Sequence, residues 1–255
     1  MTKRLTITIP TCNRPELVPT AIRSAQNQDL KEPFDILVVD ASTGANAEKM
    51  AWVSVEFPRA RWVRTPRDYG GSMTWRIAAE HCDTEYMTIL HDDDWYEPSF
   101  ARRCLEKMRP EVAYVVTEAM VHFPEEGRRE LNLKWAESGA YSSTSWERAL
   151  MSMPYTVSPC SALFRRKDVI DYLPVSMIPV RGAHRRCMAG HDLLLMLGPL
   201  PNYQGVEYIA DPLANYLAHP KSWTIGAMSD EQRNEELLAN YRAARRYWAA
   251  VRGVP

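Results

Sequence analysis

The stretch Tyr86–Trp95, YMTILHDDDW, places an apolar strand directly before three consecutive aspartates, Asp92, Asp93 and Asp94. A strand that ends in carboxylates concentrates negative charge at one edge of a sheet, and Mg²⁺ and Mn²⁺ favour oxygen ligands of this kind. The first hypothesis is therefore a metal site that also receives a diphosphate. A solvated acidic turn is the alternative, because most runs of charge lie on the surface.

Two earlier strands have the same form. Leu5–Ile9 alternates at period two and stops at Pro10, and Phe34–Asp40 is a nearly continuous apolar run that ends in a carboxylate. Between them, Asn13 is expected to cap a helix that carries apolar residues at helical spacing. Further helices are expected at about 47–55, 72–82 and 97–108, and strands at 61–64 and 112–117. This alternation predicts an α/β fold with a mostly parallel, right-handed sheet.

The second half of the chain is less regular. We expect a loop at 124–129, a short helix at 146–151, a short strand at 161–164, a helical turn that begins at Asp192, and a strand at 206–210. A loop around Tyr216 and His219 then leads to a final helix over about 230–251. No internal repeat, low-complexity linker or change in composition separates two domains.

Composition limits the classes of function. The chain has 255 residues, 45% of them apolar, and a net charge of -1, so no general attraction to nucleic acid is expected. Its five cysteines are scattered without a C-x-x-C pair, which favours reduced thiols and a cytoplasmic location. No apolar run is long enough for a transmembrane helix or a signal peptide, so neither is expected.

Several motifs occur in the order found in one enzyme family. They are Ile9–Pro15, Val38–Ser42, the pair Gly71 and Arg76, and Leu90–Trp95. Together they resemble the family 2 glycosyltransferases with the GT-A fold, which use nucleotide-diphosphate sugars. The resemblance implies a Rossmann-like nucleotide-binding half at 1–125 and an acceptor half at 126–229 in a single domain, followed by a C-terminal helix at 230–255.

The resemblance also implies roles for residues on the donor side. The nucleotide-binding residues would be Pro10, Thr11, Asn13, Arg14, Asp40, Gly71, Arg76 and Asp92. A Mn²⁺ or Mg²⁺ ion would lie on Asp93, with Asp94 and His219 nearby. The first aspartate of the family's D-x-D motif falls on His91, which is a departure from the pattern. Asp40 could also merely close a turn, and Gly70–Gly71 could be a plain turn rather than an anion site.

On the acceptor side, Gly190–Asp192 resembles the family's Glu-Asp motif with His191 in the Glu position. The resemblance makes Asp192 the general base, although an aspartate at a helix start is also an ordinary cap. The acceptor-binding residues would be Trp95, His191, Arg185 and Arg186. The basic segment Arg181–Arg186 could receive an acceptor phosphate or carboxylate, or it could be a solvated loop.

The last helix carries an apolar stripe with arginines on its edges. The stripe consists of Leu237, Tyr241, Ala244, Trp248 and Val251. It could dock on the chain's own domain, form a homodimer seam, or make a peripheral contact with an anionic membrane.

The expected activity is inverting, metal-dependent transfer of a sugar from a nucleotide-diphosphate donor, UDP being favoured, to an acceptor hydroxyl of unspecified class. A nucleotidyltransferase is a second candidate, but its glycine-rich triphosphate loop is missing from Pro10–Pro15. A binding module without turnover is a third, because His91 and His191 both depart from the family pattern.

Overall fold

A computed structural model describes residues 2–134, 137–154, 156–174, 176, 189–219, 222 and 230–253. Strands and helices alternate through the first half of the chain. They are β1 (Leu5–Thr11), α1 (Val18–Gln26), β2 (Asp35–Asp40), α2 (Gly44–Glu56), β3 (Arg61–Arg64), α3 (Gly71–Glu80), β4 (Tyr86–Ile89), β5 (Trp95–Tyr96) and α4 (Phe100–Lys107).

The second half contributes more strands and the remaining helices. They are β6 (Val112–Phe123), η1 (Pro124–Glu126), β7 (Arg128–Leu131), β8 (Gly139–Ser142), α5 (Ser143–Ser152), η2 (Pro159–Ser161), β9 (Ala162–Arg165), α6 (Arg166–Tyr172), α7 (His191–Leu197), η3 (Leu200–Asn202), β10 (Gly205–Leu217) and α9 (Glu231–Arg252).

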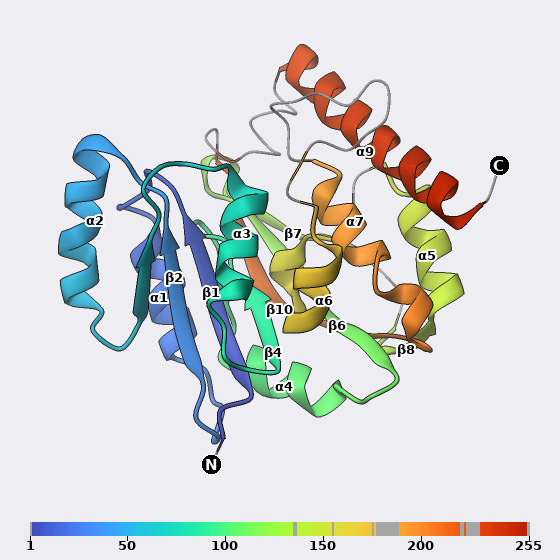
Figure 1. Ribbon diagram of the computed structural model, residues 1–255, viewed down its shortest axis with the longest axis horizontal. Helices are drawn as coiled ribbons and strands as arrows, with labels where there is room; N and C mark the ends of the chain where they lie inside the picture. Colours follow the sequence, from blue (N-terminus) through green and yellow to red (C-terminus); the bar gives the residue numbers. More distant parts are fainter. Residues whose placement is uncertain are drawn as a thin grey trace.

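The strands of this part of the chain form one sheet in the order β3-β2-β1-β4-β9-β6-β10-β5, with β7 beside β6 and β8 beside β10 (Figure 1). Strands β3, β2, β1 and β4 are parallel neighbours, and β10 runs parallel to β6. Strands β5, β7, β8 and β9 pair antiparallel with their neighbours. The mostly parallel α/β sheet predicted from the sequence is confirmed, with these four strands as its antiparallel members.

Helices cover both faces of the sheet. Alternate residues of β2 enter opposite cores: Leu37 and Val39 pack on the side of α3, α5, α6, α7 and α9, while Ile36 and Val38 pack on the side of α1 and α4. Figure 1 shows α3, α6 and α7 in front of the sheet. A strand buried on both faces needs a continuous apolar run, which is the pattern that predicted it.

The first helix begins later than the sequence pattern predicts. Helix α1 starts at Val18, whereas Asn13 has a left-handed backbone with φ of 59°. The amide of Asn13 donates to Oγ of Ser42 at 2.8 Å, and its Oδ1 accepts the amide of Thr43 at 3.0 Å. The polar groups that a helix cap would use are therefore bonded to the loop after β2, so the predicted cap at Asn13 is wrong.

The second half contains more strand than predicted. Strand β10 extends far beyond the expected 206–210 and includes Tyr216, because a register shift at Pro212 lets pairing continue past a residue without an amide donor. Strand β7 overlaps the predicted loop at 124–129. All four of its residues are exposed, so no apolar alternation marks it in the sequence.

Helix α9 packs against the chain's own domain. Leu237, Tyr241, Ala244 and Trp248 are buried in the core that also contains α7, whereas Val251 is 58% exposed. The indole of Trp248 donates to Oε1 of Glu147 on α5 at 2.7 Å. Most of the apolar stripe is therefore occupied within the chain, which was the first of the three expectations. In the described part of the chain, no helix combines the length and apolarity needed to cross a membrane.

This packing makes a prediction for stability. Replacing Leu237, which is 2% exposed, by alanine should lower the free energy of unfolding by about 2–4 kcal/mol, because it leaves a cavity between α9 and α7. Val251→Ala on the same helix is the matched control and should change it by less than about 0.5 kcal/mol. Chemical denaturation measures both values. Equal effects of the two substitutions would contradict the docking of α9.

Candidate active site

The donor side of the site begins at Asp40, the last residue of β2. Its Oδ1 accepts the amide of Ser42 at 2.8 Å, and its Oδ2 lies 3.2 Å from Nη2 of Arg64. The parallel register of β2 and β3 places Asp40 opposite Arg64, so this ion pair follows from the strand pairing. The buried carboxylate of Asp40 therefore closes a turn, which was the alternative role expected for it. It also forms an ion pair with Arg64 at the strand end.

The loops after β2 and β3 enclose a surface hollow of about 560 Å³. It is lined by Ser42, Thr43, Gly44, Ala47, Arg64, Thr65 and Pro66. Binding sites for small molecules have volumes of about 300–1,000 Å³, and in parallel sheets they lie beyond the carboxyl ends of the strands. Because Ser42 and Arg64 also bind Asp40, the hollow and the carboxylate form one unit that can receive a flat polar group such as a nucleobase.

The loop after β1 connects this hollow to the aspartates. Nη1 of Arg14 lies 2.9 Å from Oδ1 of Asp92 and 2.9 Å from Oδ2 of Asp93. Oγ1 of Thr11 donates to the other oxygen of Asp92 at 2.8 Å. Burial raises the pKa of Asp92 to about 6, although Arg14 and Thr11 favour its charged form. The bonds of Asn13 to the loop after β2 complete the connection, whereas Pro10 is buried inside β1.

Asp93 also contacts a histidine. Nε2 of His219 lies 3.1 Å from Oδ2 of Asp93, the same oxygen that contacts Arg14. His219 follows the end of β10, so the expected loop does bring it to the aspartates. A carboxylate oxygen and an imidazole nitrogen suit Mn²⁺, and Mg²⁺ would rely on the carboxylate. These two residues fit a divalent ion that leaves positions open for phosphate oxygens.

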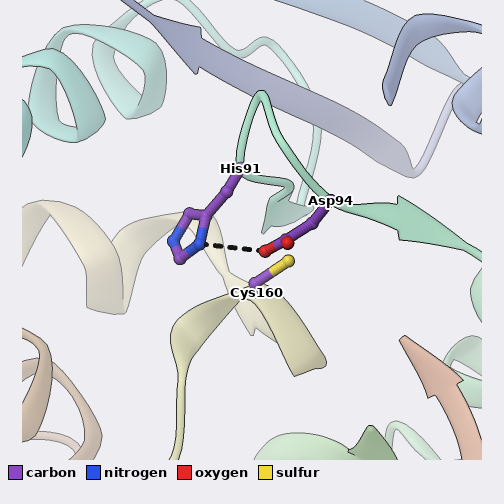
Figure 2. Close-up of side chains that lie close together, drawn as sticks. All are labelled: His91, Asp94 and Cys160. Carbon is purple, nitrogen blue, oxygen red and sulfur yellow. Dashed lines mark ion pairs between the residues drawn. The ribbon is translucent and has the colours of Figure 1, made fainter. Parts of the chain in front are cut away.

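Asp94 is directed elsewhere. Its Oδ1 accepts the amide of Leu217 at 3.0 Å, and its Oδ2 lies 3.2 Å from Nδ1 of His91. Figure 2 shows His91, Asp94 and Cys160 close together. Burial raises the pKa of Asp94. Burial opposes the charged form of His91, but Asp94, Asp93 and Asp92 raise its pKa. The structure thus pairs Asp93 with His219 and Asp94 with His91.

The ligand atoms of His91, Asp94 and Cys160 all lie within 4.8 Å of one another. Hydrogen bonding accounts for this cluster, because His91 and Cys160 both bond to Asp94. Burial and the charge of Asp94 raise the pKa of the Cys160 thiol well above its ordinary value. The neutral thiol can donate a weak hydrogen bond to Asp94. Together with the bond from His91, this contact holds Asp94 at the end of the acidic loop.

Helix α3 joins the acidic loop to the acceptor side. Gly70 precedes the helix with φ of 82°, a backbone conformation that favours glycine. The ring of Trp75 stacks on His91 with centroids 5.8 Å apart and planes at 16°. One turn earlier, Oγ of Ser72 lies 2.6 Å from Nδ1 of His191. One face of α3 therefore contacts both halves of the site.

The predicted base lies at the start of α7. Oδ1 of Asp192 accepts the amides of Gly190 and Leu193 at 2.9 and 2.8 Å, and Oδ2 accepts the hydroxyl of Tyr241 at 2.7 Å. Burial raises the pKa of Asp192 even though these bonds favour the charged form. Burial lowers the pKa of His191, which favours the neutral imidazole. Capping and a role as base are compatible, because they use different oxygens of the carboxylate.

Two predicted site residues have other contacts. Arg76 bonds to Glu80 and to the carbonyl of Ile170, so it ties α3 to α6 instead of joining Asp92 and Asp93. Trp95 packs on the ring of His122, with centroids 4.8 Å apart, on the side of β10 and β6. The predicted acceptor residues Arg185 and Arg186, with the whole segment 181–186, lie outside the described residues.

Three residues of the site were missed in the sequence. Arg64 could have been found, because strands of equal direction put it opposite Asp40. Tyr241 is the one hydroxyl-bearing side chain in an otherwise apolar stripe, and a buried tyrosine hydroxyl needs a partner. Ser72 carries no signal in the sequence, since serine near a helix start is ordinary.

Comparisons with solved structures show which known proteins share the fold. TarS residues 1–349 from S. aureus, solved with UDP-GlcNAc, superposes with a TM-score of 0.66 at 14% identity, covering 86% of this chain and 60% of that one. The mannosyltransferase PcManGT from Pyrobaculum calidifontis, solved with GDP-Man and Mn²⁺, gives a TM-score of 0.62 at 14% identity, covering 100% and 76%. The chain therefore spans less than two thirds of the TarS fragment, and these likenesses establish a shared GT-A fold.

A search of curated proteins finds no match to the chain. The family model described as Glycosyl transferase family 2 matches residues 6–173, a segment that contains the hollow, Arg14 and all three consecutive aspartates. The segment ends before Asp192 and His219. Because the match covers well over half of the sequence, the chain belongs to glycosyl transferase family 2.

Proposed function

We propose that the protein is an inverting glycosyltransferase that moves a sugar from a nucleotide-diphosphate donor to an acceptor hydroxyl with the help of a divalent ion. The observation that carries the proposal is the continuous set of contacts from the hollow beside Asp40, through Asn13 and Arg14, to Asp93 and His219. A donor nucleotide laid along these contacts has its base at one end and its diphosphate at the other.

The donor base would enter the hollow between the loops after β2 and β3. Arg64 and the polar groups of Ser42 and Thr43 line it, which suits the carbonyl and ring-nitrogen groups of a pyrimidine. We favour a UDP-sugar, and the structures of TarS with UDP-GlcNAc and PcManGT with GDP-Man make UDP and GDP the two donors to compare.

Arg14, Asp93 and His219 would handle the diphosphate. Asp93 and His219 would hold Mn²⁺ or Mg²⁺, which supplies Lewis-acid stabilisation of the departing diphosphate. Arg14 would offer its guanidinium to the phosphate oxygens, and Asp92 would hold Arg14 and Thr11 in position.

Asp192 would act on the acceptor. As the acceptor oxygen forms its bond to the anomeric carbon, Oδ2 of Asp192 takes the hydroxyl proton. The bond from that carbon to the diphosphate breaks, and its electron pair leaves with the diphosphate. Attack from the side opposite the leaving group inverts the anomeric centre. A placed base of this kind contributes about 10²- to 10⁴-fold to the rate.

The direct test is incubation of the protein with UDP- and GDP-sugars, Mn²⁺ and candidate acceptors, with release of free nucleotide diphosphate as the measurement. A transferase releases UDP or GDP. A nucleotidyltransferase would instead release pyrophosphate from a nucleoside triphosphate and a sugar phosphate. Donor binding without release of either product would support a binding module and contradict the proposal.

Substitution should separate the donor and acceptor roles. Asp93→Asn should remove the Mn²⁺-dependent rise in melting temperature caused by UDP and should also lower the rate, because ion and diphosphate are lost together. Asp192→Asn should keep that rise and lower kcat by about 10²-fold or more, because the base is lost and the donor site is intact. Near wild-type turnover in Asp192→Asn would show that another group takes the proton.

Filling the hollow should block the donor base. Ala47→Trp puts an indole into the space lined by Thr43 and Arg64, so the Kd for UDP, measured calorimetrically, should rise by about tenfold or more. Ala51→Trp is the matched control, because Ala51 is exposed one turn further along α2 and does not line the hollow. Its Kd should equal that of the wild type. Unchanged affinity in Ala47→Trp would move the base site elsewhere.

The raised pKa of Asp192 predicts the pH dependence. The carboxylate takes a proton only when ionised, so the rate should fall as pH decreases through its pKa in the folded enzyme. Because burial raises that pKa, the acidic limb of kcat/KM should lie above the ordinary aspartate value of about 3.9. Initial rates across the pH range locate the limb. A limb at or below that value would argue against Asp192.

A further inference from the structure

We propose that Tyr241 is a positioning residue for Asp192, which makes the C-terminal helix α9 a working part of the acceptor side. The inference rests on the proposed role of Asp192 as base. It goes beyond the family match, because that match ends at residue 173 and α9 begins at Glu231.

The hydrogen bonds of Asp192 carry the argument. Oδ1 accepts two backbone amides, from Gly190 and Leu193, at 2.9 and 2.8 Å. These bonds, together with one from the amide of Asp192 itself, hold the carboxylate on the first turn of α7. Because backbone amides occupy Oδ1, we assign the proton transfer to Oδ2.

Tyr241 occupies one direction on Oδ2, where its hydroxyl donates at 2.7 Å. An acceptor hydroxyl that approaches Oδ2 must therefore share this oxygen with the phenol. The phenol thus decides from which side an acceptor can approach. A carboxylate that is held at both oxygens loses less conformational entropy on reaching the transition state than a mobile carboxylate does.

The tyrosine itself is firmly held. It is 5% exposed, and its neighbours on the same helix face, Leu237 and Ala244, are buried in the core shared with α7. The guanidinium of Arg245 lies 5.8 Å from the tyrosine ring and donates to the carbonyl of Leu150 on α5. A rigid donor on a docked helix can orient a carboxylate on another helix.

The charged groups around Asp192 leave Tyr241 as its direct side-chain partner among the described residues. Arg245 of α9 interacts with Asp192 through its charge but donates to backbone carbonyls. Asp168 of α6 interacts with Tyr203 and basic neighbours, and Glu147 of α5 bonds to Trp248. The neighbouring His191 bonds to Ser72, and burial favours its neutral form.

The test compares the pH profile of kcat/KM in three variants. Tyr241→Phe removes only the hydroxyl, so the ionised form of Asp192 loses a donor and the acidic limb should move to higher pH. At a pH below the acidic limbs of both proteins, kcat/KM of Tyr241→Phe should be about tenfold lower than that of the wild type, as expected for losing a hydrogen bond to a charged group. The Kd for UDP should be the same in both.

Two controls separate positioning from stability. Tyr247→Phe removes a hydroxyl from the same helix and should leave the profile unchanged. Leu237→Ala loosens the packing of α9 but keeps the hydroxyl, so it should lower the melting temperature without moving the limb. If Tyr241→Phe also proves less stable, the comparison with Leu237→Ala still shows whether the limb has moved.

The outcomes distinguish this inference from the proposed function. If Asp192→Asn abolishes turnover and Tyr241→Phe keeps the wild-type limb, Tyr241 has no positioning role and the proposed function stands. If Asp192→Asn keeps its turnover, the base assignment and the role of Tyr241 are both overturned. A limb that moves in Tyr241→Phe alone supports both.

Discussion

The arrangement of the site depends on one shared cation, the guanidinium of Arg14 between Asp92 and Asp93. The two neighbouring carboxylates would repel each other when charged, and burial raises the pKa of Asp92. Arg14 lies 2.9 Å from each carboxylate and offsets this repulsion. Because Arg14 follows β1 and the aspartates follow β4, these two ion pairs also connect the loops of two adjacent parallel strands. Those loops are the ones that a diphosphate would have to cross.

The position of β1 explains why its loop contacts both the base-side loop and the acidic loop. Strand β1 lies between β2 and β4, so its loop touches the base-side loop on one flank and the acidic loop on the other. Asn13 bonds to Ser42 and Thr43, and Thr11 bonds to Asp92. A left-handed residue at Asn13 is what turns the chain between these two sets of partners, and asparagine tolerates that conformation better than most residues.

Sequence reasoning succeeded where burial dictates the pattern and failed where contacts between distant segments decide. The apolar run ending in Asp40 is buried on both faces as predicted, and the strand before the three aspartates ends at Ile89, one residue before the expected Leu90. Asn13 looked like a helix cap because local capping and a tertiary bond use the same side chain. Arg76 has the family's spacing, yet its partner Ile170 lies 94 residues away, where no local pattern can indicate it. The exposed strand β7 has no apolar face, so its sequence matches a loop.

The division between the two halves of the site has a physical cause. Donor residues lie on strand ends whose separation is set by parallel pairing, so short motifs in the right order place them well. Asp192 is held by no strand. Its place comes from α7, which contacts the donor half through Ser72 and His191 and contacts α9 through Tyr241. The position of Asp192 therefore depends on the packing of α3, α7 and α9, whereas the donor-side residues depend on strand pairing. Under the proposed function, a change in this helix packing would alter the approach of the acceptor and leave the contacts to the nucleotide in place, because the two sets of residues are held by different elements.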